Sequence, residues 1–324
     1  MRFCITGGAG FIGSHLCDVL LDAGHEVTAL DDLSTGSLAN LHDASARPGF
    51  RFMQGDIRDT PLVERALENC DAVVHLAARI GLRIIVESPF DTLDVNARGT
   101  ESVVQAALKN NTPVLVASTS EVYGYSTKIP SNEDDPICFG SPTIGRWSYA
   151  CAKAYDEFYA LALQRERGLP VVVVRLFNTV GARQSGRYGM VIPRLTEQAL
   201  TGNALTVYGD GTQTRCFCSV RDVTAALTAI LLRIHAFAGE VFNIGNPVEM
   251  TILNLAKQIV DRTASTSTIE FVPFSKAYPV GFEEIMRRVP DISKARRAIS
   301  FDPQVPMESI LDDVIAGLGM TAKR

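Results

Sequence analysis

A tyrosine and a lysine four residues apart could form an acid–base pair. Tyr149 and Lys153 lie in a run with helical periodicity, so their side chains project from the same face of one helix. A phenol ordinarily titrates near pH 10, but a neighbouring ammonium stabilises the phenolate and lowers its pKa. The pair therefore predicts a proton acceptor that works at neutral pH. Ser118, Thr119 and Ser120 end an earlier predicted strand and offer hydroxyl groups to the same substrate oxygen.

A glycine-rich loop near the N-terminus predicts a dinucleotide site. A predicted strand over residues 2–6 leads directly into Gly7, Gly10 and Gly13, and a helix follows. A Cβ at these glycines would block the sharp turn and keep the backbone away from a pyrophosphate, which binds free N–H groups and the positive end of the helix. Asp31 ends the next strand, where a carboxylate can accept bonds from the adenosine ribose hydroxyls. A carboxylate there repels a 2′-phosphate, which favours NAD over NADP.

Two further carboxylates could contact the same ligand. Asp32 could share the role of Asp31, or be a solvated turn residue. Asp56 and Ile57 follow the third predicted strand, where the aspartate could lie near the adenine, although an ordinary turn aspartate fits the pattern as well. The loop and Asp31 thus carry the prediction of NAD as cofactor.

Short β-rich runs alternate with amphipathic helical runs over the first 180 residues. Strands and helices that take turns pair in parallel through right-handed crossovers, which predicts an α/β fold with a Rossmann-type, doubly wound parallel sheet. After Asn178 the pattern loosens into shorter helices, turns and a proline-rich C-terminal section. We therefore expect an NAD-binding domain over residues 1–178 and a smaller, mixed substrate lobe over 179–324, with segments that can cross between the two.

Composition excludes several classes of protein. The 324 residues include 31 Lys and Arg against 36 Asp and Glu, a net charge of −5, so no basic field attracts nucleic acid or an anionic membrane. An anionic substrate must then be bound by a local cationic pocket. The seven cysteines form no Cys-x-x-Cys motif and have no matching histidine pair, so we expect buried or half-buried free thiols, no metal, and a reducing, cytoplasmic location. No apolar stretch reaches the roughly 18 residues that a membrane span needs.

The chain resembles the extended short-chain dehydrogenase/reductases that act on nucleotide sugars. Motifs in the family's order carry the resemblance: the loop 6–13 with Phe11 and Ile12, then Leu76, Ala77 and Ala78 after His75, Asn96 before Gly99, the stretch 118–124, Tyr149 with Lys153, and residues 175–178. The resemblance implies a bound NAD that these residues hold and that is used catalytically. It also implies that Tyr149 deprotonates the sugar 4-hydroxyl, that Lys153 tunes it and holds the nicotinamide ribose, and that Thr119 orients the same hydroxyl.

The resemblance also implies which residues bind the substrate and how two copies of the chain associate. Asn178 and Arg215 would contact the diphosphate, where a guanidinium suits two phosphate oxygens, and Arg194 lies in a supporting segment. A UDP-sugar is favoured and a GDP-sugar stays open. The family also implies a homodimer through the helix after Thr100 and the helix over 149–161.

Glu121 bears on which reaction follows oxidation at C4. The triplet of Thr119, Ser120 and Glu121 is similar to that of nucleotide-sugar decarboxylases and 4,6-dehydratases, in which the Glu is a base or positions the ring. Residues 139–153 and 281–292 are similar to UDP-glucuronate decarboxylases and UDP-apiose/UDP-xylose synthases, whose arginine at the sugar carboxylate matches Arg288. Because a β-keto acid loses carbon dioxide easily, the prediction is a UDP-glucuronate decarboxylase.

Two departures keep other reactions open. Residues 79–87 differ from the corresponding decarboxylase loop, and Ser120 stands where the apiose-forming enzymes have a cysteine. The alternative is a nucleotide-sugar 4-epimerase of the UDP-glucose or UDP-glucuronate type. Less favoured alternatives are a 4,6-dehydratase and an enzyme of pyranose–furanose ring rearrangement. A non-enzymatic NAD sensor predicts a broken catalytic set, whereas Thr119, Tyr149 and Lys153 are all present. A simple NADP reductase is disfavoured by Asp31.

Overall fold

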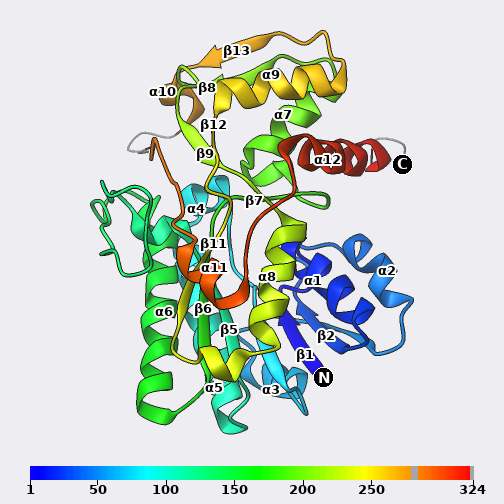
Figure 1. Ribbon diagram of the computed structural model, residues 1–324, viewed down its shortest axis with the longest axis vertical. Helices are drawn as coiled ribbons and strands as arrows, with labels where there is room; N and C mark the ends of the chain where they lie inside the picture. The colour runs from blue at the N-terminus through cyan, green and yellow to red at the C-terminus, as the bar shows by residue number, and fades with distance from the viewer. Residues whose placement is uncertain (279–283, 322–324) are drawn as a thin grey trace.

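The centre of the protein is a seven-stranded parallel sheet with the strand order β11-β6-β5-β4-β1-β2-β3 (Figure 1). The computed structural model describes residues 1–278 and 284–321. The strands are β1 (Arg2–Thr6), β2 (Glu26–Asp31), β3 (Phe50–Gln54), β4 (Ala72–His75), β5 (Val114–Thr119), β6 (Val171–Leu176) and β11 (Val241–Ile244). This order confirms the predicted doubly wound α/β sheet, whose direction of winding reverses between β1 and β4.

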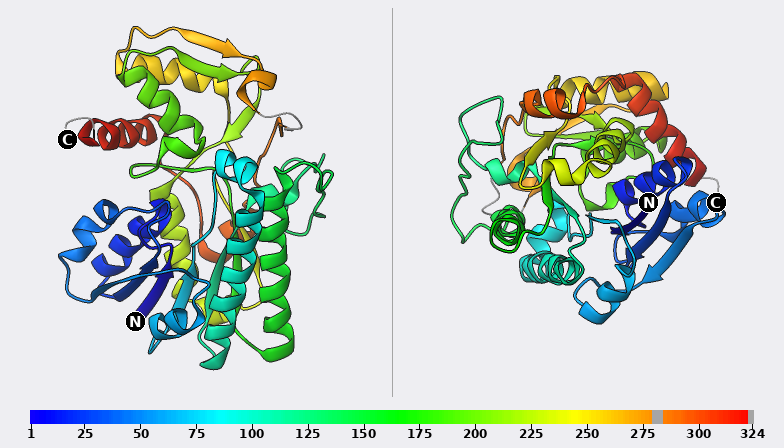
Figure 2. Two further views of the ribbon diagram at one scale, coloured as in Figure 1. Left: turned by 180° about the vertical axis from the view of Figure 1, so that it is seen from behind. Right: turned by 60° about the horizontal axis from the view of Figure 1, so that its bottom comes forward.

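Helices cover both faces of the sheet, so its central strands are apolar on both sides. One face carries α3 (Thr60–Ala66), α5 (Pro89–Lys109) and α6 (Trp147–Arg167), and the last two lie side by side (Figure 2). The other face carries α1 (Phe11–Asp22), α2 (His42–Ser45), α8 (Val220–Leu231) and α11 (Ser293–Ile299). Residues 171–174 are four consecutive buried valines, the pattern typical of a strand covered on both faces. Each such burial contributes about 1.5–3 kcal/mol.

The C-terminal half divides between this sheet and a second lobe. Strand β11 pairs with β6, and α8 packs against α1, so these segments return to the sheet after residue 179. The second lobe contains α7 (Val191–Leu200), α9 (Ile252–Thr263), α10 (Phe274–Ala277) and α12 (Met307–Thr321). Its short strands pair as β8 (Leu205–Tyr208) with β13 (Ile269–Val272) and β9 (Thr214–Cys216) with β12 (Glu249–Thr251), while β7 (Thr179–Val180) pairs with β10 (Cys218–Ser219) beside the sheet. This lobe has a hydrophobic core of its own, which includes Leu195, Leu205 and Leu255.

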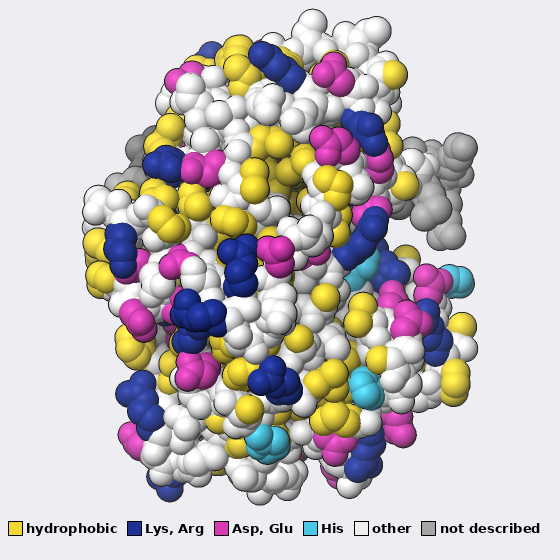
Figure 3. All heavy atoms as spheres, viewed as in Figure 1, with side chains coloured by type: hydrophobic (Ala, Val, Ile, Leu, Met, Phe, Trp, Pro, Cys, Tyr) yellow, Lys and Arg dark blue, Asp and Glu magenta, His cyan; other side chains and the backbone are white. Residues whose placement is uncertain are grey.

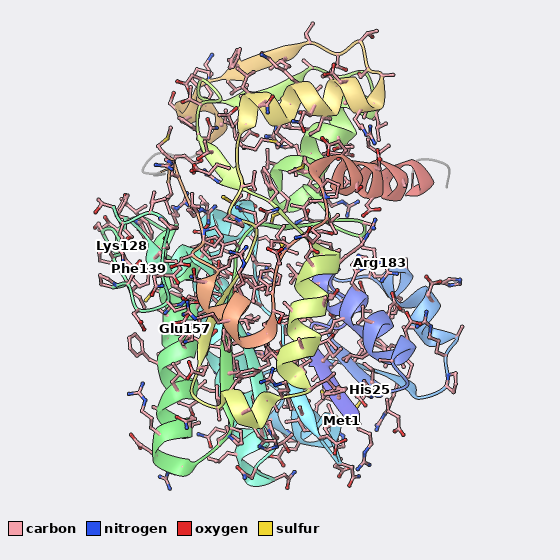
Figure 4. The ribbon with its side chains drawn as sticks, viewed as in Figure 1. Met1, His25, Lys128, Phe139, Glu157 and Arg183 are labelled. Carbon is pink, nitrogen blue, oxygen red and sulfur yellow. The ribbon has the colours of Figure 1, made fainter. Side chains whose placement is uncertain are left out.

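Helix α6 is fixed to the sheet by a buried ion pair. The Arg175 guanidinium on β6 donates to both carboxylate oxygens of Glu157 on α6, with its shortest bond 2.7 Å from Nη2 to Oε2. Glu157 is labelled in Figure 4. The Ser118 hydroxyl on β5 donates to the same carboxylate. The helix ends at Gly168, which adopts the left-handed φ of +74° that favours glycine. These contacts set the position of the residues that α6 presents at its N-terminal end.

The surface and the cysteines bear on the expected class of protein. Basic and acidic side chains are interspersed over the face shown in Figure 3. Within residues 1–278 and 284–321, no helix combines the length and apolar character needed to cross a membrane. All seven cysteines are free thiols, but Cys138 and Cys151 are exposed, which corrects the expectation that every thiol would be buried or half-buried. Cys151 lies on the exposed side of α6, and Cys138 lies in the segment that leads into this helix.

Candidate active site

A cleft of about 490 Å³ runs from the glycine loop to the second lobe. The carboxyl ends of β1, β2, β4, β5 and β6 form one wall, at the place where the strand order reverses. The cleft brings together all the predicted site residues except Asn96. The Asn96 side chain is buried, accepts a hydrogen bond from the Arg79 backbone N–H at 2.7 Å and donates to the Arg79 carbonyl at 3.2 Å. Asn96 therefore fixes the backbone of Arg79, which lines the cleft, without lining the cleft itself.

The glycine loop has the shape that a pyrophosphate requires. Gly7 adopts a φ of +73°, and a Cβ there would lie 2.7 Å from the Ala77 nitrogen. A Cβ on Gly13 would lie 2.2 Å from the Gly7 carbonyl oxygen. Helix α1 begins at Phe11 after Gly10, which has no capping side chain, so the N–H groups of the first turn are open to an anion. The loop thus fits a dinucleotide, and only glycine is tolerated at Gly7 and Gly13.

The Asp31 carboxylate is fixed beside this loop. Its Oδ2 accepts a hydrogen bond from the Ala9 backbone at 3.0 Å, and its Oδ1 accepts one from Leu33 at 2.8 Å. Burial raises the pKa of Asp31, and these two hydrogen bonds oppose the shift. The group remains a hydrogen-bond acceptor facing the cleft, as the ribose of an adenosine would need.

The other two acidic candidates line the cleft but also make local bonds. Asp32 accepts hydrogen bonds from the backbone and side chain of Ser34, at 2.9 and 2.6 Å, in an ordinary turn. Asp56 pairs with Arg58 at 2.6 Å, and this hydrogen-bonded guanidinium lowers the pKa of Asp56. Both interpretations made from the sequence, turn residue and ligand contact, are therefore compatible with their placement.

Tyr149 and Lys153 lie together on α6 with Thr119 opposite, at the end of β5. All three line the cleft and are buried. Burial raises the pKa of Tyr149, and the Glu121 charge raises it further, whereas a hydrogen bond with Thr119 acts in the opposite direction. The sequence predicted that Lys153 lowers this pKa, and the structure differs.

Burial is the first cause of this difference, and an acidic partner that the sequence analysis missed adds to it. The Lys153 ammonium donates a hydrogen bond to Asp156 Oδ2 at 2.9 Å, and both side chains are almost fully buried. The carboxylate offsets the charge that would otherwise stabilise a phenolate. A spacing of three residues after Lys153 places Asp156 on the same helical face, so this signal was present in the sequence.

Glu121 is held between two arginines. Its Oε1 accepts a hydrogen bond from Arg288 Nη1 at 2.7 Å, and its Oε2 lies 3.5 Å from Arg146 Nη2. Burial would raise the pKa of Glu121, but the charges of Arg288, Arg146 and Arg215 outweigh this effect and lower it. Arg215 in turn donates to Glu284 at 2.5 Å. Arg146 and Glu284, which belong to the motifs noted above, were not among the predicted site residues.

The remaining predicted substrate residues line the second-lobe side of the cleft. Asn178 donates to the Cys216 carbonyl at 3.1 Å. Arg194 donates to the Thr206 carbonyl at 2.9 Å, and its guanidinium carbon lies 4.3 Å from the centre of the Tyr208 ring. Ser120 is buried on the first-lobe side of the cleft. Gly281, Phe282 and Glu283, which belong to a motif noted above, lie outside the described residues. In the described part of the chain, no group of three or more His, Cys, Asp or Glu side chains is arranged to hold a metal ion.

A parallel sheet that winds in both directions, a glycine loop at its reversal point and a Tyr–Lys pair on the adjacent helix define a dinucleotide-dependent enzyme of the Rossmann type. Residues 3–245 match the model of the NAD dependent epimerase/dehydratase family, and the chain belongs to that family.

Several relatives share almost the whole chain. A UDP-N-acetyl-alpha-D-glucosaminuronate decarboxylase of Bacillus cytotoxicus is 42% identical over 316 residues, which cover 97% of this chain and 96% of the relative. A UDP-glucuronic acid decarboxylase 1 of Danio rerio is 37% identical over 97% of this chain and 72% of its own length. Among solved structures, a UDP-glucuronic acid 4-epimerase of Bacillus cereus, in complex with UDP-glucuronic acid and NAD, superposes with a TM-score of 0.89 at 28% identity. The superposition covers 99% of this chain and all of the epimerase chain.

Proposed function

We propose that this protein is an NAD-dependent decarboxylase of a UDP-linked uronic acid, which acts through a transient 4-keto sugar. The observation that carries the proposal is the placement of Glu121, paired with Arg288 at 2.7 Å, in the same cleft as Tyr149 and Thr119. A cationic group beside the oxidisable hydroxyl suits a sugar that bears a carboxylate. The decarboxylase relatives, which match almost the full chain, support the same assignment.

The cofactor fits the first-lobe side of the cleft. Gly7, Gly10, Phe11, Ile12 and Gly13 would hold the pyrophosphate, Asp31 the adenosine ribose, Asp56 and Ile57 the adenine, and Leu76, Ala77, Ala78 and Lys153 the remainder. When bound, NAD adds a positive charge beside the phenol, accepts hydride from sugar C4 and later returns it. This assignment rests on the cradle at Gly7 and Gly13, which a Cβ would fill.

The first chemical step is removal of the proton of the 4-hydroxyl. Tyr149 must be a phenolate for this step, which the positive charge of bound NAD would favour against the effect of burial; it then accepts this proton while Thr119 orients the hydroxyl. Lys153, whose Nζ donates to Asp156 Oδ2, would hold the nicotinamide ribose. Once the hydride at C4 has also left, C4 is a ketone, β to the carboxylate.

Loss of carbon dioxide follows from the position of that ketone. The C5–C6 bond breaks, and its electron pair moves to C5 and the C4 oxygen as an enolate. The hydroxyl groups of Tyr149 and Thr119 donate to that oxygen and stabilise the developing charge. A proton from water is then added at C5, hydride returns to C4 as Tyr149 gives its proton to O4, and the product is the corresponding UDP-pentose. Glu121, ionised because of its two arginines, acts as a base or positions the ring.

The second lobe supplies the groups for the rest of the substrate. Arg288 would bind the sugar carboxylate, and Arg215 with Asn178 would bind the diphosphate. Arg194 and Tyr208 lie where the nucleoside would pack. UDP is the favoured nucleotide because the curated relatives named above act on UDP-sugars by name.

Product analysis tests the proposal. The purified protein is incubated with UDP-glucuronate and, separately, with UDP-N-acetylglucosaminuronate, the two substrates that the relatives' names suggest. We expect release of carbon dioxide from at least one of them and a UDP-pentose in the NMR spectrum, with GDP-glucuronate as the comparison for the base. Recovery of a uronate inverted at C4, without carbon dioxide, would establish the 4-epimerase alternative that the solved epimerase structure favours.

We also propose that the protein is a homodimer through α5 and α6. These neighbouring helices expose Phe90 and Phe158, which are 74% and 65% accessible, together with Leu93 and Tyr155 at 40% each. A two-fold contact would bury these exposed side chains on both copies. Light scattering of the wild type and of Phe158→Glu tests this, since a monomeric wild type would contradict it.

A further inference from the structure

The two oxygens of the Glu121 carboxylate are bound by arginines that differ in access to the cleft. Arg288, which binds Oε1 at 2.7 Å, has 14% of its side chain accessible. Arg146, which lies 3.5 Å from Oε2, has 4% accessible. Both arginines line the cleft, but Arg288 exposes more of its side chain to a ligand that enters it, whereas Arg146 is almost fully buried.

The two arginines also differ in the secondary structure of the backbone that carries them. Arg146 directly precedes α6, three residues before Tyr149, and its guanidinium carbon lies 5.8 Å from the centre of the Trp147 ring. The helix that carries the proposed base thus also carries Arg146. Arg288 lies in the extended segment before α11, outside any helix or strand.

Binding of a uronate would change the partners of Glu121. If Arg288 binds the substrate carboxylate, Glu121 loses its 2.7 Å hydrogen bond while only 20% of its side chain is accessible. A buried carboxylate without a cationic partner is strongly disfavoured and takes up a proton instead. A second cation at the other oxygen prevents this.

The other charged groups around Glu121 leave this role to Arg146. Arg215, on β9, is bound to Glu284, whose Oε1 also lies 4.0 Å from Arg146 Nη1. Tyr149, on α6, faces Glu121, whose charge adds to the effect of burial in raising the pKa of Tyr149. Within this described cluster three arginines face the two carboxylates of Glu121 and Glu284, so one positive charge is in excess. The carboxylate of the substrate would supply a third negative charge to the cluster, in addition to the diphosphate assigned to Arg215.

We propose that Arg146 is a positioning residue that holds Glu121 in place, as an anion directed at the sugar, when Arg288 turns to the substrate carboxylate. This inference rests on the proposed function for the identity of the substrate. It assigns the two arginines different tasks: Arg288 binds the substrate, and Arg146 acts through Glu121.

The test compares Arg146→Gln with Arg146→Lys. The matched control is Arg287→Gln, since Arg287 is the immediate neighbour of Arg288 but pairs with Glu249 on the surface. Two quantities are measured on the holoenzyme: kcat/KM for carbon dioxide release from UDP-glucuronate as a function of pH, and titration of the Glu121 carboxyl by ¹³C NMR in protein labelled at glutamate Cδ. The Glu121 signal is identified by its absence in Glu121→Gln.

For Arg146→Gln we expect the Glu121 signal and the acid limb of kcat/KM to move together to higher pH by about one unit, a loss of about tenfold at acid pH that recovers as pH rises. KM should change by less than about twofold, because Arg288 still binds the carboxylate. Arg146→Lys should restore the acid limb, and Arg287→Gln should match the wild type.

Different results separate the possible failures. A rise in KM with an unmoved acid limb would overturn the proposal, because Arg146 would then bind the substrate carboxylate itself. An unchanged Glu121 titration in Arg146→Gln would overturn it as well. If the wild type releases no carbon dioxide, the proposed function fails, while the NMR titration still decides whether Arg146 controls Glu121.

Discussion

Replacing Arg288 by glutamine removes the cation that we assign to the substrate carboxylate. A hydrogen bond to a charged group contributes about 1.5–3 kcal/mol, and each 1.4 kcal/mol corresponds to a factor of ten. The KM for UDP-glucuronate should therefore rise by about 10- to 150-fold in Arg288→Gln. Because the Arg288 side chain is only 14% accessible, water replaces little of the lost contact and the effect should lie in the upper part of this range.

The assay separates the sugar carboxylate from the rest of the substrate. KM is obtained from carbon dioxide release, and the dissociation constant of UDP is measured by calorimetry on the same preparations. UDP carries no sugar carboxylate, so its affinity should change by less than about twofold. Equal weakening of UDP and UDP-glucuronate would refute the assignment, because Arg288 would then bind the diphosphate. An unchanged KM would show that it binds neither.

Three further changes test other parts of the site. Tyr149→Phe should lower turnover at least about 100-fold, because the proton acceptor is lost, while bound NAD measured after denaturation stays near the wild-type amount; near-normal turnover would remove Tyr149 from its role. Gly13→Ala should abolish NAD binding in a fluorescence titration, since its Cβ would lie 2.2 Å from the Gly7 carbonyl oxygen, and unchanged affinity would show that the loop does not hold the pyrophosphate. Arg175→Met should lower the free energy of unfolding by about 3–5 kcal/mol in urea, because Glu157 is left buried and unpaired; a loss under about 1 kcal/mol would show that the pair is not needed.

Local sequence signals were sufficient to predict the central sheet and the residues on the cofactor side of the site. The buried valines at 171–174 identify a covered strand, and the glycines and Asp31 lie next to their own strands, so short-range pattern determines their placement. Tyr149 and Lys153 are one helical turn apart and needed no tertiary information.

The other side of the site depends on contacts that no local pattern encodes. Glu121 and Arg288 are 167 residues apart, and their pairing requires the second lobe to fold against the sheet. Arg146 and Glu284 were recognised only as parts of motifs, because their shared position becomes evident when three chain segments meet. The raised pKa of Tyr149 also escaped prediction, since it depends on burial, on the Glu121 charge and, to a smaller extent, on Asp156.

The ion pairs on the two sides of Tyr149 explain how one phenol can serve a charged substrate. Lys153 and Asp156 form a fixed pair inside the protein, so their combined charge does not change when a ligand enters the cleft. The pair of Arg288 and Glu121 faces the cleft, so it is this pair that an incoming carboxylate rearranges. Glu121 and Arg288 both act on the pKa of Tyr149, so this rearrangement reaches the base from its substrate side, while discrimination between uronates and neutral sugars falls to the arginines. A neutral nucleotide sugar would leave Arg288 paired with Glu121.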